Sequence, residues 1–185
     1  RMEKNLVSKS IIILFFILSY YIFPLKAQII GSETGFKIPR FISLKSNDAN
    51  LRLGSSKNYP IILKYTSKDL PLEILDEYED WRRIIDINGN EGWMHKNLLK
   101  GDRSAIINTD TANVYNKPHG YTVGQIGRNN IVQLKKCLID WCLIKKNKNH
   151  GWILKKNLWG VYQDEIINIP NYQFIINLFW KIGFK

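Results

Sequence analysis

Short apolar segments separated by turn residues recur along the chain and predict an all-β protein. The segments are rich in Ile, Leu and aromatic side chains and are shorter than a typical helix. Asn88-Gly89 between two of them favours a tight hairpin, because both residues tolerate positive φ. The expected strands are 41–45, 50–53, 61–65, 70–78, 81–87 and 92–95, followed by 104–109, 112–115, 122–126, 131–137, 141–146 and 151–154.

One pattern of short motifs occurs twice. The pairs Asp-Trp, Gly-Trp and Asn-Leu lie at 80–81, 92–93 and 97–98, and again at 140–141, 151–152 and 157–158. Upstream, Ala-Asn-Leu-Arg at 49–52 corresponds to Ala-Asn-Val-Tyr at 112–115. A repeat of roughly sixty residues predicts two small tandem domains, at 39–100 and 101–163. Duplication of this kind suits a tandem binder better than a catalytic site.

The alternation of side chains along the Asp-Trp strand separates its two faces. We assign Ile84 to the interior, which leaves Trp81 facing outward beside Arg83, whose cationic side chain could lie across the indole ring. The equivalent residues of the second copy are Ile144 and Cys142 inside, and Trp141 and Lys145 outside.

Residues 1–27 have the composition of a secretory signal. A basic stretch is followed by an apolar run at 11–23 and by Ala27, after which we expect cleavage. The alternative is an uncleaved anchor, but the run is shorter than the about 20 apolar residues of a spanning helix. Cleavage would place the mature chain in the periplasm or outside the cell, with no remaining membrane span. Residues 28–38, rich in Gly, Ser, Thr and Lys, are expected to form a mobile linker.

The sequence pattern of the tail at 164–185 differs from the strand pattern that precedes it. Apolar residues at helical spacing within 171–185 predict one short amphipathic helix after Pro170. It could cover an edge of the second domain or, alternatively, lie on a membrane surface.

The formal net charge of the chain is +11. Residues 1–27 contain four basic residues and one acidic residue, so cleavage leaves +8. A basic exported protein favours anionic surfaces such as lipid, cell-wall polymer or acidic protein. The alternative is a general compositional bias, because Lys, Asn and Ile are frequent throughout. No dense Arg/Lys run indicates nucleic acid, and we expect no nucleic-acid partner.

Cys137 and Cys142 are the two cysteines of the chain. If the segments on either side of 138–141 pair as a hairpin, the thiols can face each other, and a disulfide closing so small a loop contributes about 2 kcal/mol. Free thiols are the alternative. The spacing fits neither a Cys-x-x-Cys redox motif nor a zinc site, and we predict no metal and no cofactor.

Catalytic signals are weak. Three histidines are present, but no nucleophile or metalloprotease motif accompanies them. The acidic residues between Glu73 and Asp80 could supply a carboxylate pair, although a solvated turn explains them better. We therefore predict that the chain is not an enzyme.

The repeated motifs A-N-L-R, D-W-R-R-I, E-G-W-M-H and N-L-L, with D-W-C-L-I, H-G-W-I and N-L-W-G-V-Y, resemble bacterial SH3-like (SH3b) domains, in the tandem secreted type of alphaproteobacteria. The resemblance covers about residues 39 to 163 and implies two small β-barrels of about five strands each. It implies that the Gly-Trp strand and the Asn-Leu turn close each barrel. The structural residues would then be Trp93, Trp152, Leu98 and Leu158. The first copy lacks the cysteines.

In that family the Asp-Trp aromatic borders the groove where ligand can lie. With the outward assignment above, the candidate ligand-binding residues are Trp81 and Arg83 in the first copy and Trp141 and Lys145 in the second. Tyr59, with Tyr65, could extend the groove of the first copy. The alternative is that these aromatic residues only shelter a face of the sheet.

The sequence thus supports an exported, non-catalytic binding protein that recognises peptidoglycan peptide or an envelope protein through tandem SH3-like domains. The alternative function is a regulatory or targeting subunit of a cell-envelope hydrolase. A cryptic hydrolase is a third hypothesis, which we do not expect.

Overall fold

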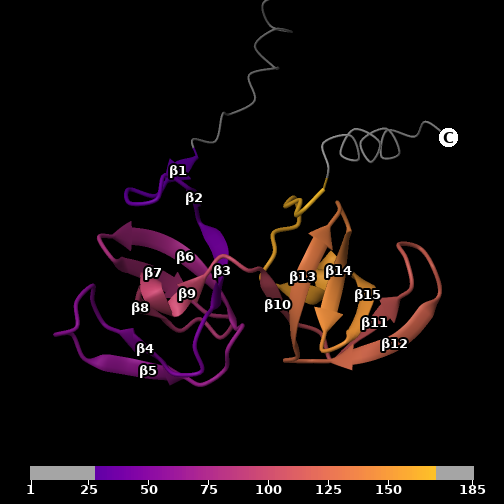
Figure 1. The fold of residues 1–185 in the computed structure, drawn as a ribbon, viewed down its shortest axis with the longest axis horizontal. Helices are drawn as coiled ribbons and strands as arrows, with labels where there is room; N and C mark the ends of the chain where they lie inside the picture. The colour runs from indigo at the N-terminus through magenta and orange to yellow at the C-terminus, as the bar shows by residue number, and fades with distance from the viewer. Residues whose placement is uncertain (1–27, 170–185) are drawn as a thin grey trace, which may run out of the picture.

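The computed structural model describes residues 28–169, which form an all-β protein (Figure 1). Apart from two 3-10 turns, η1 (Lys96–Leu98) and η2 (Lys155–Asn157), the regular structure of this part of the chain is strand. Two sheets, one for each copy of the repeat, lie side by side. Between residues 28 and 169, no helix is long and apolar enough to cross a membrane.

The first repeat folds into a seven-stranded antiparallel sheet in the order β5-β4-β8-β7-β6-β3-β9. Consecutive strands joined by short turns are mostly neighbours, as expected of a meander. The strands are β3 (Arg40–Leu44), β4 (Ala49–Arg52), β5 (Ile61–Tyr65), β6 (Pro71–Tyr78), β7 (Trp81–Ile85), β8 (Glu91–His95) and β9 (Leu99–Lys100).

The second repeat forms an equivalent sheet in the order β12-β11-β15-β14-β13-β10-β16. Its strands are β10 (Ser104–Ile107), β11 (Thr111–Tyr115), β12 (Thr122–Gly127), β13 (Ile131–Cys137), β14 (Trp141–Lys146), β15 (Asn149–Leu154) and β16 (Leu158–Trp159). The strands predicted from the sequence agree with these bounds to within two residues. Each sheet has seven paired strands rather than about five, and its two edges do not join, so neither repeat is a closed barrel.

The interior of each repeat is built from alternate residues of these strands. Ile84 and Ile144 are buried, which confirms their inward assignment. The other buried apolar residues include Leu44, Leu51, Leu72, Ile74 and Met94 in the first repeat, and Ala105, Ile107, Val132, Leu134 and Ile153 in the second.

The tryptophans of the Gly-Trp pairs, which we expected to be structural, do not belong to the buried core. Trp93 and Trp152 are only half-buried, whereas the next residues, Met94 and Ile153, are fully buried. Successive side chains of a strand point to opposite faces. Because Met94 and Ile153 face the interior of their sheets, each tryptophan lies on the outer face and covers it only in part.

The two Asn-Leu pairs are not equivalent positions. Lys96 donates its backbone N–H to Asp80, and Lys155 donates in the same way to Asp140, which fixes the correspondence of the two 3-10 turns. Counting from these lysines, Leu158 matches Leu99 rather than Leu98. The two Asn-Leu pairs are equally far from their Asp-Trp pairs, but the turn between the Asp-Trp and Gly-Trp strands has one residue more in the first repeat, which shifts Leu98 out of alignment with Leu158. Leu99 and Leu158 are buried, and Leu98 is only partly buried.

The expectation of a mobile linker at 28–38 was wrong. This segment is a hairpin of β1 (Ile29–Ile30) and β2 (Lys37–Ile38). Its turn is held by the buried carboxylate of Glu77, which accepts hydrogen bonds from the backbone N–H of Glu33 at 3.1 Å and of Thr34 at 2.9 Å and from the Thr34 hydroxyl at 2.8 Å. A carboxylate 43 residues away in sequence therefore orders an otherwise polar segment.

The segment after β16 covers the second repeat in a similar way. Ile167 exchanges two backbone hydrogen bonds with Cys137, at 3.0 and 3.1 Å, and forms an isolated bridge. Residues 164–169 of the predicted tail are therefore not helical. The expected helix at 171–185 and the signal at 1–27 lie outside the described residues.

The two sheets contact each other through β3 and β6 of the first repeat and through β10, β16 and the segment after β16 of the second. The ring of Phe41 lies 5.1 Å from that of Trp159 and 4.7 Å from that of Tyr162, measured between centroids. The buried hydroxyls of Ser43 and Ser104 are hydrogen-bonded at 2.5 Å, and the Tyr162 hydroxyl donates to Glu73 at 2.5 Å. The repeats thus form a packed pair.

Candidate ligand-binding groove

A groove of about 380 Å³ opens in the first repeat beside Trp81. Its walls come from β4, β7, β8, the 3-10 turn η1 and the loop at 53–60. The groove is lined by Asn50, Arg52, Lys57, Trp81, His95, Asn97 and Leu98. It therefore combines apolar and aromatic surface with two cations and two amide side chains, a mixture that suits a peptide with carboxyl and amide groups.

Trp81 contributes to the groove but is not the exposed platform that we expected. Only 8% of its surface is exposed. His95, its register partner on β8, packs its ring edge-on at 5.4 Å between centroids. Alternation correctly put Trp81 on the face opposite Ile84, but neighbouring side chains cover that face. A ligand can therefore reach a border of the indole and not its whole ring.

The loop wall of the groove is fixed by Arg52. Its Nη1 donates to the backbone oxygens of Lys57 at 3.0 Å and Tyr59 at 2.7 Å. The Tyr59 ring lies against Gly54, where an added Cβ would come within 2.6 Å of ring atoms, so this close approach requires glycine. Tyr59 itself is exposed and is not among the lining residues; its backbone, rather than its ring, shapes the groove.

The opposite wall contains a small charged network. Nδ1 of His95 accepts the backbone N–H of Asn97 at 3.3 Å, and its Nε2 lies 3.9 Å from the Asp80 carboxylate. Lys96 pairs with Asp80 at 2.7 Å, and this hydrogen-bonded cation lowers the pKa of Asp80. Lys96 therefore offsets the negative charge beside His95, while Arg52 and Lys57 keep the lining itself cationic.

Arg83 does not lie across the Trp81 ring. Its guanidinium Nη1 is 3.1 Å from the carboxylate of Glu91, and its Nε is 4.0 Å from that of Asp76. In residues 28–169, the cation–π contacts are those of Arg40 with Phe36 and of Arg103 with Phe41. Two carboxylates on the flanking strands compete successfully for the arginine, which leaves it outside the groove.

The equivalent face of the second repeat is packed differently. Trp141 is 7% exposed, and the rings of Tyr115 and His119 contact it edge-on at 5.1 and 5.4 Å between centroids. Tyr115 occupies the position that Arg52 has in the first repeat. The outward platform expected at Trp141 is therefore wrong for the same reason as at Trp81. Lys145 is half-buried and lines a different hollow, together with Asp69 of the first repeat.

Sequence reasoning missed several groove residues. Arg52, Lys57, His95 and Asn97 were not among the candidates, although Arg52 belongs to the repeated Ala-Asn-Leu-Arg motif. The divergence from Arg52 to Tyr115 could have indicated that the two grooves differ. Lys57 gave no such signal, because its place depends on the path of the 53–60 loop.

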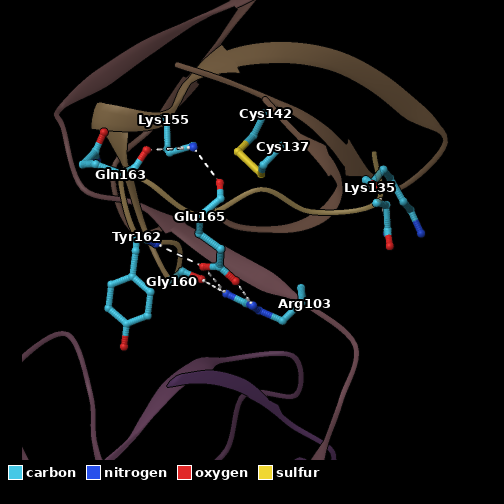
Figure 2. The surroundings of a disulfide bond; sticks show 10 residues. Arg103, Lys135, Cys137, Cys142, Lys155, Gly160, Tyr162, Gln163 and Glu165 are labelled. Carbon is cyan, nitrogen blue, oxygen red and sulfur yellow. Dashed lines mark hydrogen bonds and ion pairs between the residues drawn. A yellow bond between two sulfur atoms is a disulfide. The ribbon is translucent and has the colours of Figure 1, made fainter. Parts of the chain in front are cut away.

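The predicted disulfide between Cys137 and Cys142 is present. The two residues are register partners on β13 and β14, as the hairpin argument required. Figure 2 shows the segment that lies near the bond: Nζ of the fully buried Lys155 donates to the backbone oxygens of Gln163 at 3.0 Å and Glu165 at 2.8 Å. Burial lowers the pKa of Lys155, against the opposing field of Glu165.

Glu165 in turn holds Arg103 at the start of the second repeat. Its two carboxylate oxygens both accept from the guanidinium, whose Nη2 also donates to the Gly160 backbone oxygen at 2.9 Å (Figure 2). A bidentate pair of this kind fixes orientation as well as contributing charge attraction. The network joins the covering segment to the boundary between the repeats.

No group of three or more His, Cys, Asp or Glu within residues 28–169 is arranged to hold a metal ion.

Comparison with known proteins identifies the class of domain. The family described as bacterial SH3 domain matches residues 45–101 and 109–160, one match for each sheet. These matches cover more than half of the chain, which therefore belongs to the bacterial SH3 domain family, in a tandem arrangement. The resemblance to tandem SH3b domains noted in the sequence is thereby confirmed.

Two solved structures are also similar, at low identity. NlpC1 from Trichomonas vaginalis is 16% identical, with a TM-score of 0.30, over 70% of this chain and 48% of its own. NlpC2 from the same organism is 15% identical, with a TM-score of 0.31, over 79% of this chain and 57% of its own. The chain thus spans about half the length of these two proteins. Among curated proteins, no sequence matches the chain.

Proposed function

We propose that this chain is an exported, non-catalytic binding protein that recognises peptidoglycan peptide or an envelope protein, and that the groove beside Trp81 is its principal site. Bacterial SH3 domains suggest peptidoglycan or protein binding as a class. The observation that carries the proposal is the groove lining, where Arg52 and Lys57 lie beside the aromatic border of Trp81.

The chemistry of a stem peptide matches this lining. Its carboxylates can pair with Arg52 or Lys57, its amides can bond to Asn50 and Asn97, and its aliphatic groups can contact Trp81. Each exposed ion pair contributes at most about 1 kcal/mol, so the expected affinity of one groove is weak. Such a site functions best on a polymer that presents many copies of the same peptide.

The test uses retention of the purified protein on peptidoglycan at moderate salt. Substitution of Trp81 is unsuitable because the side chain is buried and its loss would disturb the fold. Lys57→Glu is preferable, since Lys57 is exposed and lines the groove. Lys45→Glu is the matched control: it makes the same change of charge on an exposed residue of the same repeat that does not line the groove.

We expect the wild-type protein and Lys45→Glu to be retained and Lys57→Glu to be released at lower salt. Equal retention of the two variants would show attraction by net charge alone and would contradict a groove-specific site. The alternative, a targeting subunit of an envelope hydrolase, would instead give no wall retention and one stoichiometric enzyme on cross-linking.

A further inference from the structure

A second and larger cavity, of about 580 Å³, lies in the other repeat at a different place. It opens between β12 and the ends of β14 and β15 that meet at the Asn147 turn. Its inner wall is apolar and is formed by Val114, Ile126 and Ile144. Its volume falls within the range of pockets that hold small ligands or side chains, about 300 to 1,000 Å³.

The cavity is associated with one difference between the two repeats. Leu63 is the register partner of Leu51 on β5, and the corresponding partner of Val114 on β12 is Gly124. Leu63 packs against the core of the first repeat, whereas a Cβ added at Gly124 would have no heavy atom within 4 Å. The second repeat therefore has open space where the first has a leucine side chain.

The rim of the cavity is cationic. Lys146 and Lys148 lie on the turn side with His150, and no acidic residue is among the lining residues in the described part of the chain. Lys146 is hydrogen-bonded to the side-chain oxygen of Asn130. Lys148 is exposed and makes no ion pair within residues 28–169. Charge complementarity thus favours an anionic partner.

One side of the cavity is formed by β12, which is an edge strand. β12 is the last strand of its sheet, so its outer backbone groups have no strand partner within residues 28–169. Val123 on this strand is 53% exposed and also lines the cavity. An edge strand next to a pocket offers backbone hydrogen bonds for an extended segment and a space for one of its side chains.

We propose that this cavity binds an acidic peptide segment, which extends along β12, places one apolar side chain in the space over Gly124 and pairs its carboxylates with Lys146 and Lys148. The site goes beyond the function proposed above, because it belongs to the other repeat, has different lining residues and does not depend on the Trp81 groove.

The test is a titration of the full chain, labelled with nitrogen-15, with an acetylated peptide in which one leucine is flanked on each side by two glutamates. Backbone amide shifts are expected at Gly124 and Lys148. Replacing the peptide's glutamates by glutamines should weaken binding about fivefold, as expected for exposed charge pairs. Replacing its leucine by glycine should weaken it as well.

Gly124→Leu is the decisive variant, because it gives the second repeat the residue of the first. The φ of Gly124 is not positive, so leucine is compatible with the backbone there. We expect binding to fall at least about tenfold, which corresponds to about 1.4 kcal/mol. Thr122→Leu is the control, since it adds the same side chain to an exposed residue of β12 that does not line the cavity.

Unchanged binding by Gly124→Leu would overturn the proposal. Should that variant fail to fold, Lys148→Glu provides an independent test, and unchanged binding by this folded surface variant would overturn the proposal equally. Peptide shifts that map to the Trp81 groove and disappear in Lys57→Glu would also refute it, while supporting the first site.

Discussion

The two repeats differ in the pair of residues that links the two strands at the end of one hairpin. At the end of the β6–β7 hairpin, Glu77 and Arg82 are register partners, and at the same place on β13 and β14 the partners are Cys137 and Cys142. An ion pair in the first repeat therefore occupies the position of a disulfide in the second. In both, a segment from outside the hairpin covers the pair.

Because of this difference, each repeat depends on its covering segment in a different way. Glu77 is fully buried and needs the donors of the N-terminal hairpin and of Arg40, which lies 2.7 Å away. The disulfide has no charge to satisfy, and Ile167 covers it with backbone hydrogen bonds to Cys137 and with a buried side chain of the same apolar cluster. This end of the hairpin is thus stabilised in the first repeat by hydrogen bonds and ion pairs to a buried carboxylate, and in the second repeat by a covalent bond.

The largest effect should come from Glu77→Ala. The change leaves Arg40 and Arg82 without their shared carboxylate and removes the acceptor of the Thr34 hydrogen bonds. Loss of one partner of a buried ion pair costs about 3 kcal/mol or more. Urea unfolding measures the loss, with Glu79→Gln as an exposed control. Equal stability of the two variants would contradict the dependence of the first repeat on this carboxylate.

A smaller effect should follow removal of the disulfide in the second repeat. The variant Cys137→Ala with Cys142→Ala should lose about 2 kcal/mol, because the closed loop is short. Reduction of the wild-type protein should give a similar loss in urea unfolding, and the double variant should not respond to reductant. A response of the double variant to reductant would show that the loss has another cause.

Next in size is the contrast between Lys155→Met and Lys96→Met, which are equivalent positions. Loss of the two hydrogen bonds from Lys155 to Gln163 and Glu165 should cost about 1 to 2 kcal/mol, since the carbonyls lose buried donors. Lys96 is half-exposed in its pair with Asp80, and its loss should cost less than about 0.5 kcal/mol. Chemical denaturation of both variants measures the two losses of stability. A larger loss for Lys96→Met than for Lys155→Met would contradict the stabilising role of the Lys155 hydrogen bonds.

The smallest effect is expected from mild acid. Burial opposes ionisation of Glu77, but hydrogen bonds from Thr34 and Arg40 outweigh it, so the pKa of Glu77 lies below its ordinary value of 4.5. A lowered pKa in the folded state contributes stability above the unfolded value, and this contribution is lost as the pH falls through the folded value. The contribution should therefore begin to shrink as the pH falls below about 4.5.

Unfolding free energies of the wild type and of Glu77→Gln, measured from neutral to acid pH, test this effect. Their difference should stay constant down to about pH 4.5 and shrink below it. A difference that grows as the pH falls would reverse the sign and contradict the assignment.

Much of the fold could be predicted from the sequence because its signals are local. Period-two alternation placed Ile84 and Ile144 inside, and the five-residue spacing of the cysteines across a short hairpin predicted the disulfide. The repeated motifs predicted two units of one fold.

The predictions that were wrong concern features that depend on contacts between segments far apart in the sequence. Alternation places Trp81 on a face but does not show that His95 covers it. The composition of 28–38 is polar, and only the buried Glu77 explains why this segment is ordered. The surfaces of the two repeats differ through single substitutions, such as Leu63 against Gly124, whose effect can be read only from the register of both sheets.

The packed boundary at Phe41, Ser43 and Ser104 holds the two repeats at one separation and orientation. Two binding modules on a flexible tether adjust to many target spacings, whereas a rigid pair engages both sites only where the target presents them at one separation. Under the two proposals made above, a target that presents a stem peptide and an acidic segment at that separation would be held by both repeats at once, and any other target would be held by a single repeat.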